Sequence, residues 1–327
     1  MKTGPFATLR AATRALTFAA ALAATIASTI AVAPLRAQVH EPAPSAGKAE
    51  KVDIITPHIT DSHHLEVPWI LPPFAKEVEL PRWKPVHIGA LEVDLSPTKH
   101  VVMLLIAAAL LLLSLTFAAR SQRRAVAAGA APKGAPNALE AMILYIRNEV
   151  IVPNVGHHGN GFVPYLLTVF FFILTLNLLG LIPYGSTATG NISVTATLAM
   201  LTFLTVEIAG IRANGWGYLR TIFYWNNDLP WWMRFPMSVL MSPIELIGKL
   251  TKPFALAIRL FANMTAGHIV VLALMGLIFT FASFVSAAPF LMAILMMVLE
   301  LFVSFLQAFI FTLLSSVFIG QIRSAHH

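Results

Sequence analysis

The stretch Lys252-Pro-Phe-Ala-Leu-Ala-Ile-Arg-Leu-Phe-Ala-Asn-Met-Thr-Ala-Gly-His268 decides the fold, because it carries an arginine into a long apolar segment. A charge at the centre of a bilayer costs about 2.5 to 3.5 kcal/mol on insertion scales, so Arg259 is expected to serve a function. The alternative is that Arg259 lies near a helix end and extends its guanidinium to the lipid headgroups. The functional interpretation is favoured by further polar residues in the same two apolar segments, which are Asn263, His268, Glu300 and Gln307.

The composition predicts an all-α integral membrane protein. Hydrophobic residues make up 57% of the chain and charged residues 11%, and the mean hydropathy is +0.75, which soluble domains do not normally show. The net charge is +7, but the basic residues lie at the ends of apolar spans, which indicates orientation in a membrane and not nucleic-acid binding. Without cysteine there is no disulfide, thiolate nucleophile or Cys-ligated metal. We expect no cofactor and no metal site.

The N-terminal part of the chain divides into two segments before the first span. Residues 1–37 resemble a secretory signal peptide, with basic residues, the apolar run Ala15–Ala33 and small residues suited to cleavage. An uncleaved apolar anchor is the alternative. Residues 38–98 are rich in Pro, His, Glu and Lys, and predict an extracytoplasmic segment of turns with a short hairpin. His58, His63 and His64 lack the helical spacing of a metal site.

Residues 99–327 are predicted to form a transmembrane ion-channel domain with five membrane-spanning helices. The expected spans are residues 101–119, 162–183, 191–211, 236–281 and 289–322. The Lys and Arg residues of the short loops fall on one side, which places the mature N-terminus outside and the C-terminus in the cytoplasm. An amphipathic helix over residues 138–152 is expected along the cytoplasmic surface of the membrane.

The last two apolar stretches are too long for simple spans. At about 1.5 Å per residue they predict helices of roughly 70 and 50 Å, whereas the hydrocarbon core is about 30 Å thick. These helices must therefore tilt steeply, kink or lie partly in the interface. The turn over residues 286–289 joins them as a hairpin.

Helical spacing arranges the polar residues of these two stretches in stripes. Glu245, Lys252, Arg259 and Asn263 share roughly one face of the first helix, and Glu300, Ser304 and Gln307 share one face of the second. Antiparallel pairing across the turn brings His268 and Glu300 to similar depths. A structural alternative is that His268, Glu300 and Gln307 only hydrogen-bond between helices. Glu245 and Lys252 could likewise form only an interfacial ion pair, and Asn177 is open to both interpretations.

These stripes predict a water-filled path for ions that is interrupted by a positive charge. Glu245 and Lys252 would line its cytoplasmic end, and His268, Glu300 and Asn177 its outer end, with Arg259 between them. A permanently charged guanidinium repels protons and cations. It also attracts a carboxylate on a partner, so that an ion could pass the arginine only while bound to that partner's carboxylate.

Three motifs carry a resemblance to a known family. Together with the opening stretch, Glu300-Leu-Phe-Val-Ser-Phe-Leu-Gln-Ala-Phe-Ile-Phe311 and Leu176-Asn-Leu-Leu-Gly-Leu-Ile-Pro183 closely resemble subunit a of the rotary (F-type) ATP synthase membrane sector, from about residue 101 to 322. The resemblance implies that Arg259 faces the carboxylates of the rotating c-ring, against which the hairpin is tilted. It implies that Asn263, His268, Glu300 and Gln307 belong to access channels.

The sequence therefore predicts a non-catalytic stator subunit of a complex that makes ATP, in a bacterial inner membrane. Its expected partners are the c-ring proteolipids, the peripheral-stalk b subunits and the lipid bilayer. The expected ion is H⁺, with Na⁺ as the less favoured alternative. Two rival functions are a secondary transporter, which would show internal inverted repeats and broken helices, and a structural scaffold, which would tolerate loss of Arg259.

Overall fold

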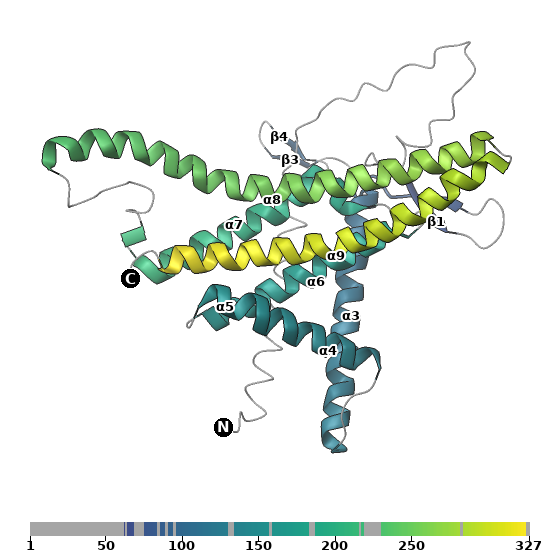
Figure 1. Cartoon of the computed structure of the whole chain (residues 1–327), viewed down its shortest axis with the longest axis horizontal. Helices are drawn as coiled ribbons and strands as arrows, with labels where there is room; N and C mark the ends of the chain where they lie inside the picture. The colour runs from purple at the N-terminus through teal and green to yellow at the C-terminus, as the bar shows by residue number, and fades with distance from the viewer. Residues whose placement is uncertain are drawn as a thin grey trace, which may run out of the picture. The chain divides into compact units, whose positions relative to one another are not determined.

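The computed structural model describes residues 62, 64–68, 75–83, 86–88, 91–93, 96–129, 134–156, 159–182, 187–215, 217–218, 230–281 and 284–324. The predicted signal segment, residues 1–37, lies outside the described residues, as do His58 and His63. Within the described residues the chain is mostly helical (Figure 1).

Among the described residues, five helices are long and apolar enough to cross a membrane, which confirms the predicted all-α membrane fold. They are α3 (Lys99–Ala127), α6 (Val163–Gly180), α7 (Ile192–Asn214), α8 (Trp231–Phe281) and α9 (Ala287–Ser324). The last turn of α3 contains Arg124, and the last turn of α9 contains Arg323. Cations at a helix C-terminus are favourable because the last carbonyls point there.

Helix α8 begins before its predicted start, and α9 exceeds its predicted bounds at both ends. Helix α8 has 51 residues and α9 has 38, which correspond to about 76 and 57 Å at about 1.5 Å per residue. Helix α8 stays continuous although Pro236, Pro243 and Pro253 lie inside it. Each proline removes one backbone hydrogen bond and crowds the preceding turn, so these positions are the expected places for bending.

Two small hairpins precede α3, where the sequence predicted turns and one hairpin. Strand β1 (His64–Pro68) pairs antiparallel with β2 (Ala75–Glu79), with His64 opposite Glu79. Strand β3 (Val86–Ile88) pairs antiparallel with β4 (Leu91–Val93). Ser96 accepts a hydrogen bond from the Trp83 amide at 2.9 Å, and the amide of Lys99 donates to the Ser62 carbonyl at 3.0 Å. These bonds hold the chain at the start of α3.

The stretch predicted to form the amphipathic helix is helical, in three consecutive pieces. Helix α4 (Ala135–Tyr145) continues as the wide π-helical turn η1 (Ile146–Ile151) and the short helix α5 (Val152–Val155). Gly156 follows with a φ of 81°, which ends the helix. The side chain of Gln122 on α3 donates to Glu140 on α4 at 2.6 Å. The position of α4 along the membrane surface remains a prediction.

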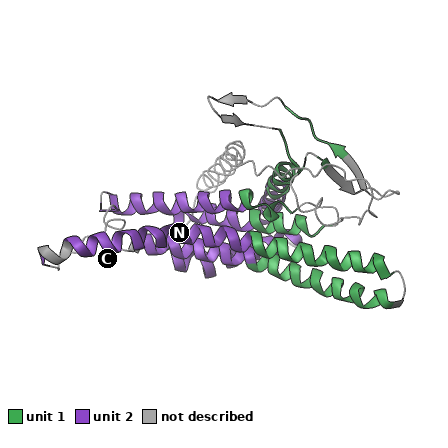
Figure 2. Ribbon diagram, turned by 90° about the horizontal axis from the view of Figure 1, so that it is seen from above, with its two compact units in different colours: residues 1–111, 172–194, 261–306 green, residues 112–171, 195–260, 307–327 purple. Residues whose placement is uncertain are grey.

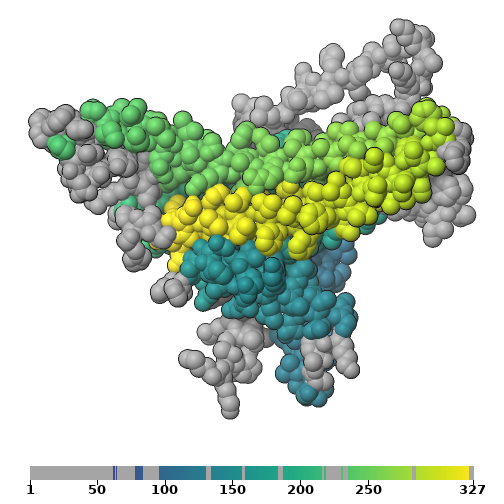
Figure 3. Space-filling model, in the orientation of Figure 1, coloured from purple at the N-terminus to yellow at the C-terminus, as the bar shows by residue number. Residues whose placement is uncertain are grey.

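The chain divides into two compact units, coloured separately in Figure 2. The first unit comprises residues 1–111, 172–194 and 261–306, and the second comprises residues 112–171, 195–260 and 307–327. In the first unit the C-terminal part of α8 and the first part of α9 lie side by side (Figures 1 and 3). Their outer surface is apolar, with exposed residues that include Phe279, Leu295 and Phe302. Such a surface suits lipid or partner helices.

Candidate functional site

In the first unit, the hairpin of α8 and α9 brings His268 and Glu300 together. Nδ1 of His268 lies 3.9 Å from Oε1 of Glu300, so the predicted proximity of these two residues is confirmed. The side chain of Glu300 is only 6% exposed, and its Oε1 has no hydrogen-bond partner among the described residues. A buried carboxyl oxygen without a donor is costly to keep charged, so this group is suited to binding and releasing a proton.

The glycine before His268 makes this close approach possible. A Cβ atom built on Gly267 would lie 3.1 Å from Oε1 and 3.2 Å from Cδ of Glu300. Any larger residue would therefore push the carboxyl group away from its place on α9. Small residues at helix contacts in membranes allow this kind of approach.

Asn177 belongs to the same unit and is fully buried on α6. Its Nδ2 donates to the carbonyl of Ser304 at 3.3 Å, and its Oδ1 accepts from Thr189 Oγ1 at 2.8 Å. Ser304 is buried one helical turn beyond Glu300, and its own hydroxyl has no hydrogen-bond partner in the described part of the chain. We call His268, Glu300, Asn177 and Ser304 the acid–histidine cluster.

The turn between α6 and α7 holds Asn177 in place, and sequence reasoning missed its role. This turn contains the short helix η3 (Ala188–Gly190). Besides the bond from Thr189, Thr265 on α8 donates to the carbonyl of Gly190 at 3.4 Å. Nδ2 of Asn191 lies 3.3 Å from Nδ1 of His100, a residue buried at the start of α3. A run of Thr and Asn residues in the loop between α6 and α7 was the available signal, because such residues bond readily to nearby backbone.

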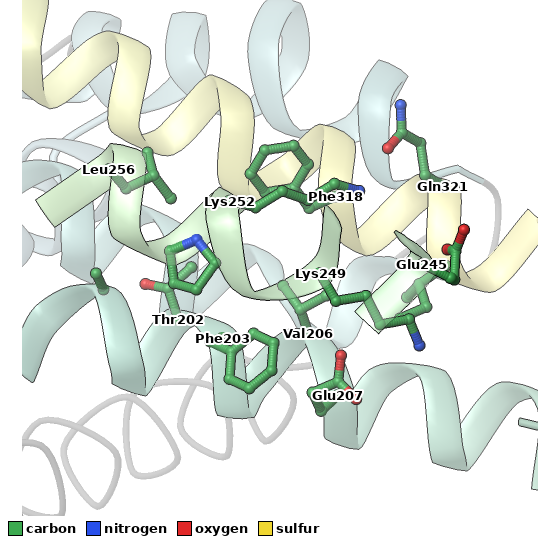
Figure 4. Close-up of a pocket in the computed structure, with 13 residues that line it drawn as sticks. Thr202, Phe203, Val206, Glu207, Glu245, Lys249, Lys252, Leu256, Phe318 and Gln321 are labelled. Carbon is green, nitrogen blue, oxygen red and sulfur yellow. The ribbon is translucent and has the colours of Figure 1, made fainter. Parts of the chain in front are cut away.

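In the second unit, Glu245 and Lys252 line one cavity, as their shared helix face predicted. The cavity has a volume of about 230 Å³. Figure 4 shows side chains from α7, α8 and α9 around it, among them Glu207, Lys249 and Gln321. Its apolar wall includes Leu256 and Phe318. We call this space the lysine cavity.

The lysine cavity contains a chain of polar contacts that the sequence did not predict. The hydroxyl of Tyr218 donates to Oε2 of Glu207, and Nζ of Lys249 donates to the same hydroxyl at 3.2 Å. Nζ of Lys249 also lies 4.5 Å from the centre of the Tyr218 ring. Nζ of Lys252 lies 4.8 Å from the ring centre of Phe318, in a cation–π contact. A carboxylate inside the apolar α7, Glu207, was the signal that could have indicated this group.

Three predicted residues, named below, have no side-chain hydrogen bond or ion pair with another described residue. Arg259 is half-buried on the part of α8 that belongs to the second unit, and it makes no ion pair or hydrogen bond with any described residue. Asn263 is exposed, in the first unit. Gln307 is buried, at 5% exposure, in the second unit. The described residues contain no group of three or more His, Cys, Asp or Glu side chains that could hold a metal.

Comparison with known proteins decides the family. Residues 101–320 match the family described as ATP synthase A chain. The chain belongs to that family. It is 44% identical over 301 residues to ATP synthase subunit a 2 of Chlorobaculum tepidum, an alignment that covers 90% of this chain and 80% of the relative. It is 45% identical to ATP synthase subunit a of Chloroherpeton thalassium, with 83% of this chain and 77% of the relative covered.

A third relative extends the same assignment to another bacterium. ATP synthase subunit a of Anaeromyxobacter sp. is 49% identical over 238 residues, which cover 72% of this chain and 56% of that relative. The family match begins at residue 101 and ends at residue 320. It therefore includes both the acid–histidine cluster and Arg259, and it leaves the hairpins and His100 outside. As a member of the ATP synthase A chain family with five apolar helices, the chain is a multi-pass membrane protein.

Proposed function

We propose that this chain is the stator subunit of a proton-translocating ATP synthase in a bacterial inner membrane. It would provide two offset aqueous half-channels, with Arg259 as the gate that couples proton flow to rotation of the c-ring. The chain itself performs no catalysis in this proposal. Its partners are the c-ring proteolipids and the b subunits of the peripheral stalk, and the translocated ion is H⁺ in preference to Na⁺.

The observation that carries the proposal is the state of Arg259. Its guanidinium lies on an apolar helix, half-buried, without an ion pair or hydrogen bond among the described residues. Such a charge in a membrane span needs a partner, and a carboxylate on another subunit is the partner that a rotor would supply. Electrostatic attraction to that carboxylate would release its proton on one side of the arginine and allow reloading on the other.

The acid–histidine cluster and the lysine cavity supply the half-channels in this proposal. The acid–histidine cluster, with Asn263 nearby in the sequence, would line the outer half-channel. The lysine cavity, with Glu245 and Lys252, would line the cytoplasmic one, because Lys and Arg residues of short loops favour that side. Gln307 would belong to the route on α9. A potential of about 100 mV supplies about 2.3 kcal/mol per proton, enough to bias each rotation step.

Substitution of the arginine tests the proposal in the assembled complex. The complex carrying Arg259→Ala is reconstituted in vesicles, and ATP-driven proton pumping is measured beside ATP hydrolysis and subunit content. We expect full assembly, loss of pumping, and faster passive proton leakage because the repelling charge is gone. Arg212→Ala, at an exposed position of α7, serves as the control and should pump normally.

The same experiment separates the rival functions. Normal pumping by the Arg259→Ala complex would refute the gate. A structural scaffold predicts that this variant either behaves as the native complex or fails to assemble. A secondary transporter predicts ion flux in vesicles that contain this chain alone, without the rotor.

A further inference from the structure

The lysine cavity contains a carboxylate that the gate mechanism above does not use. Glu207 lies on α7, within a membrane span, and its half-buried side chain lines the same cavity as Glu245 and Lys252. Ionisable residues are rare inside membrane spans because burying a charge there costs free energy. Those that do occur commonly mark ion pathways. The position of Glu207 inside a membrane span therefore requires a physical explanation.

The contacts of Glu207 hold its carboxylate in one position. Tyr218 donates its hydroxyl to Oε2 of Glu207, and that hydroxyl in turn accepts a hydrogen bond from Lys249. The ring of Tyr218 is fixed by packing, since it is 4% exposed and a Cβ on Gly210 would lie 2.6 Å from its Cε2. The carboxylate is thus preorganised by a side chain that has little freedom to move.

The charges around Glu207 also permit a change in its protonation. Lys249 on α8 lines the cavity with it, and Lys252 and Glu245 lie on the same helix along the same wall (Figure 4). With two lysines and two glutamates the group is neutral overall when all four are ionised. One proton added to Glu207 leaves a single positive charge, which a shared hydrogen-bond network can distribute.

We propose that Glu207 is a further proton-relay residue of the cytoplasmic half-channel, with Tyr218 and Lys249 as the residues that position it. This inference rests on the proposed function. In each relay step a proton donor in the cavity breaks its own bond to the proton, and the carboxylate forms one new O–H bond to it. That bond breaks when the proton passes on to the next acceptor in the cavity, so Glu207 returns to its ionised form once per translocated proton.

A merely structural role makes a different prediction that can be measured. If Glu207 only neutralises Lys249, its loss leaves this half-buried lysine without its neutralising carboxylate, and removing both charges should restore function. If Glu207 carries protons, the double variant should remain as impaired as the single one. A double-mutant cycle of Glu207→Gln, Lys249→Gln and the pair therefore separates the two roles.

The cycle is measured as ATP-driven proton pumping by the whole complex in vesicles, normalised to the amount of assembled chain. We expect Glu207→Gln to reduce pumping at least about tenfold, in line with the loss of one acid–base group. The double variant should stay equally low, and Glu207→Asp should recover most of the activity. Normal pumping by Glu207→Gln, or recovery in the double variant, would overturn the relay.

Two further variants keep the test decisive. If the Glu207→Gln complex does not assemble, Tyr218→Phe takes its place, because this change keeps the packed ring and removes only the hydroxyl donor. A several-fold loss of pumping by Tyr218→Phe supports the relay. Wild-type pumping by this variant refutes it. Arg259→Ala is measured in the same series. Loss of pumping there with normal pumping by Glu207→Gln would refute this inference alone, whereas normal pumping by Arg259→Ala would refute the gate.

Discussion

The acid–histidine cluster and the lysine cavity place carboxylates in different hydrogen-bonding surroundings. Glu300 is almost fully buried, lacks a hydrogen-bond donor on Oε1 and has an imidazole at 3.9 Å as its charge partner. Glu207 is half-buried and accepts a hydrogen bond from Tyr218, with two lysines lining the same cavity. The first carboxyl oxygen therefore lacks the hydrogen-bond donor that a buried acceptor needs, whereas the second has one.

This contrast suggests a division of labour between the two units. A carboxyl group that is poorly satisfied can exchange its proton with little reorganisation, which suits a site where protons bind from a wet space. A carboxylate that accepts a hydrogen bond from a buried tyrosine keeps one orientation, which suits a site where a proton passes between fixed groups. Each setting depends on one or two close contacts, so single substitutions should remove the difference between them.

The largest effect is expected at Glu300. Glu300→Gln keeps the shape of the side chain and removes its capacity to carry a proton, so pumping should fall by about two orders of magnitude, as for loss of an acid–base group. Assembly should be unchanged, because an amide is cheaper to bury than a carboxylate. The measurement is ATP-driven acidification of vesicles containing the complex.

Thr280→Ala is the matched control for Glu300→Gln in the first unit. Its hydroxyl bonds only to the carbonyl of Gly276 on its own helix, and it is exposed. This variant should acidify vesicles at the native rate. Native acidification by Glu300→Gln would show that the acid–histidine cluster is structural.

An intermediate effect is expected at Gly210. An alanine there would place Cβ 2.6 Å from the ring of Tyr218 and 3.0 Å from Cγ1 of Ile322. Overpacking of this kind costs about 1 to 3 kcal/mol, and the displaced ring would lose its bond to Glu207. We expect a lower thermal unfolding temperature of the complex together with reduced pumping. Gly248→Ala, which meets nothing within 4 Å, should change neither.

The smallest effect is expected at Gly267. A Cβ atom at 3.1 Å from Oε1 of Glu300 requires the carboxyl group to shift by only a few tenths of an ångström. Pumping by Gly267→Ala should therefore fall a few-fold while thermal stability stays near the native value. Gly276→Ala on the same helix has open space around it and serves as the reference. Equal pumping by both variants would show that the spacing of His268 and Glu300 is not critical.

The sequence predicted the spans well because the bilayer constrains them strongly. A fixed hydrocarbon thickness requires long apolar runs, and the five expected runs correspond to α3, α6, α7, α8 and α9. The contact of His268 with Glu300 followed from antiparallel pairing across a short turn. In such a hairpin the depth of each residue depends mainly on its distance from the turn, which the sequence gives directly.

The contacts that the sequence did not predict depend on rotation about helix axes. Helices α6 and α7 are apolar on nearly every side, so no polar stripe indicates which face of α7 turns toward α8. The bond from Tyr218 to Glu207 needs that rotation and the path of a loop, and neither is encoded in spacing. The bond from Asn177 to the Ser304 carbonyl joins residues 127 positions apart, which only packing can bring together.

The exposed surface of helices α8 and α9 affects the stability of the chain before it is assembled into the complex. Helices α8 and α9 leave most of their apolar residues uncovered, and α8 also presents a half-buried guanidinium and an exposed amide at Asn263. In bare lipid these two polar groups remain unsatisfied, so the orphan subunit is less stable than the assembled one. Membrane quality-control proteases would then remove surplus copies, and the cell would match the supply of this subunit to that of the rest of the membrane complex.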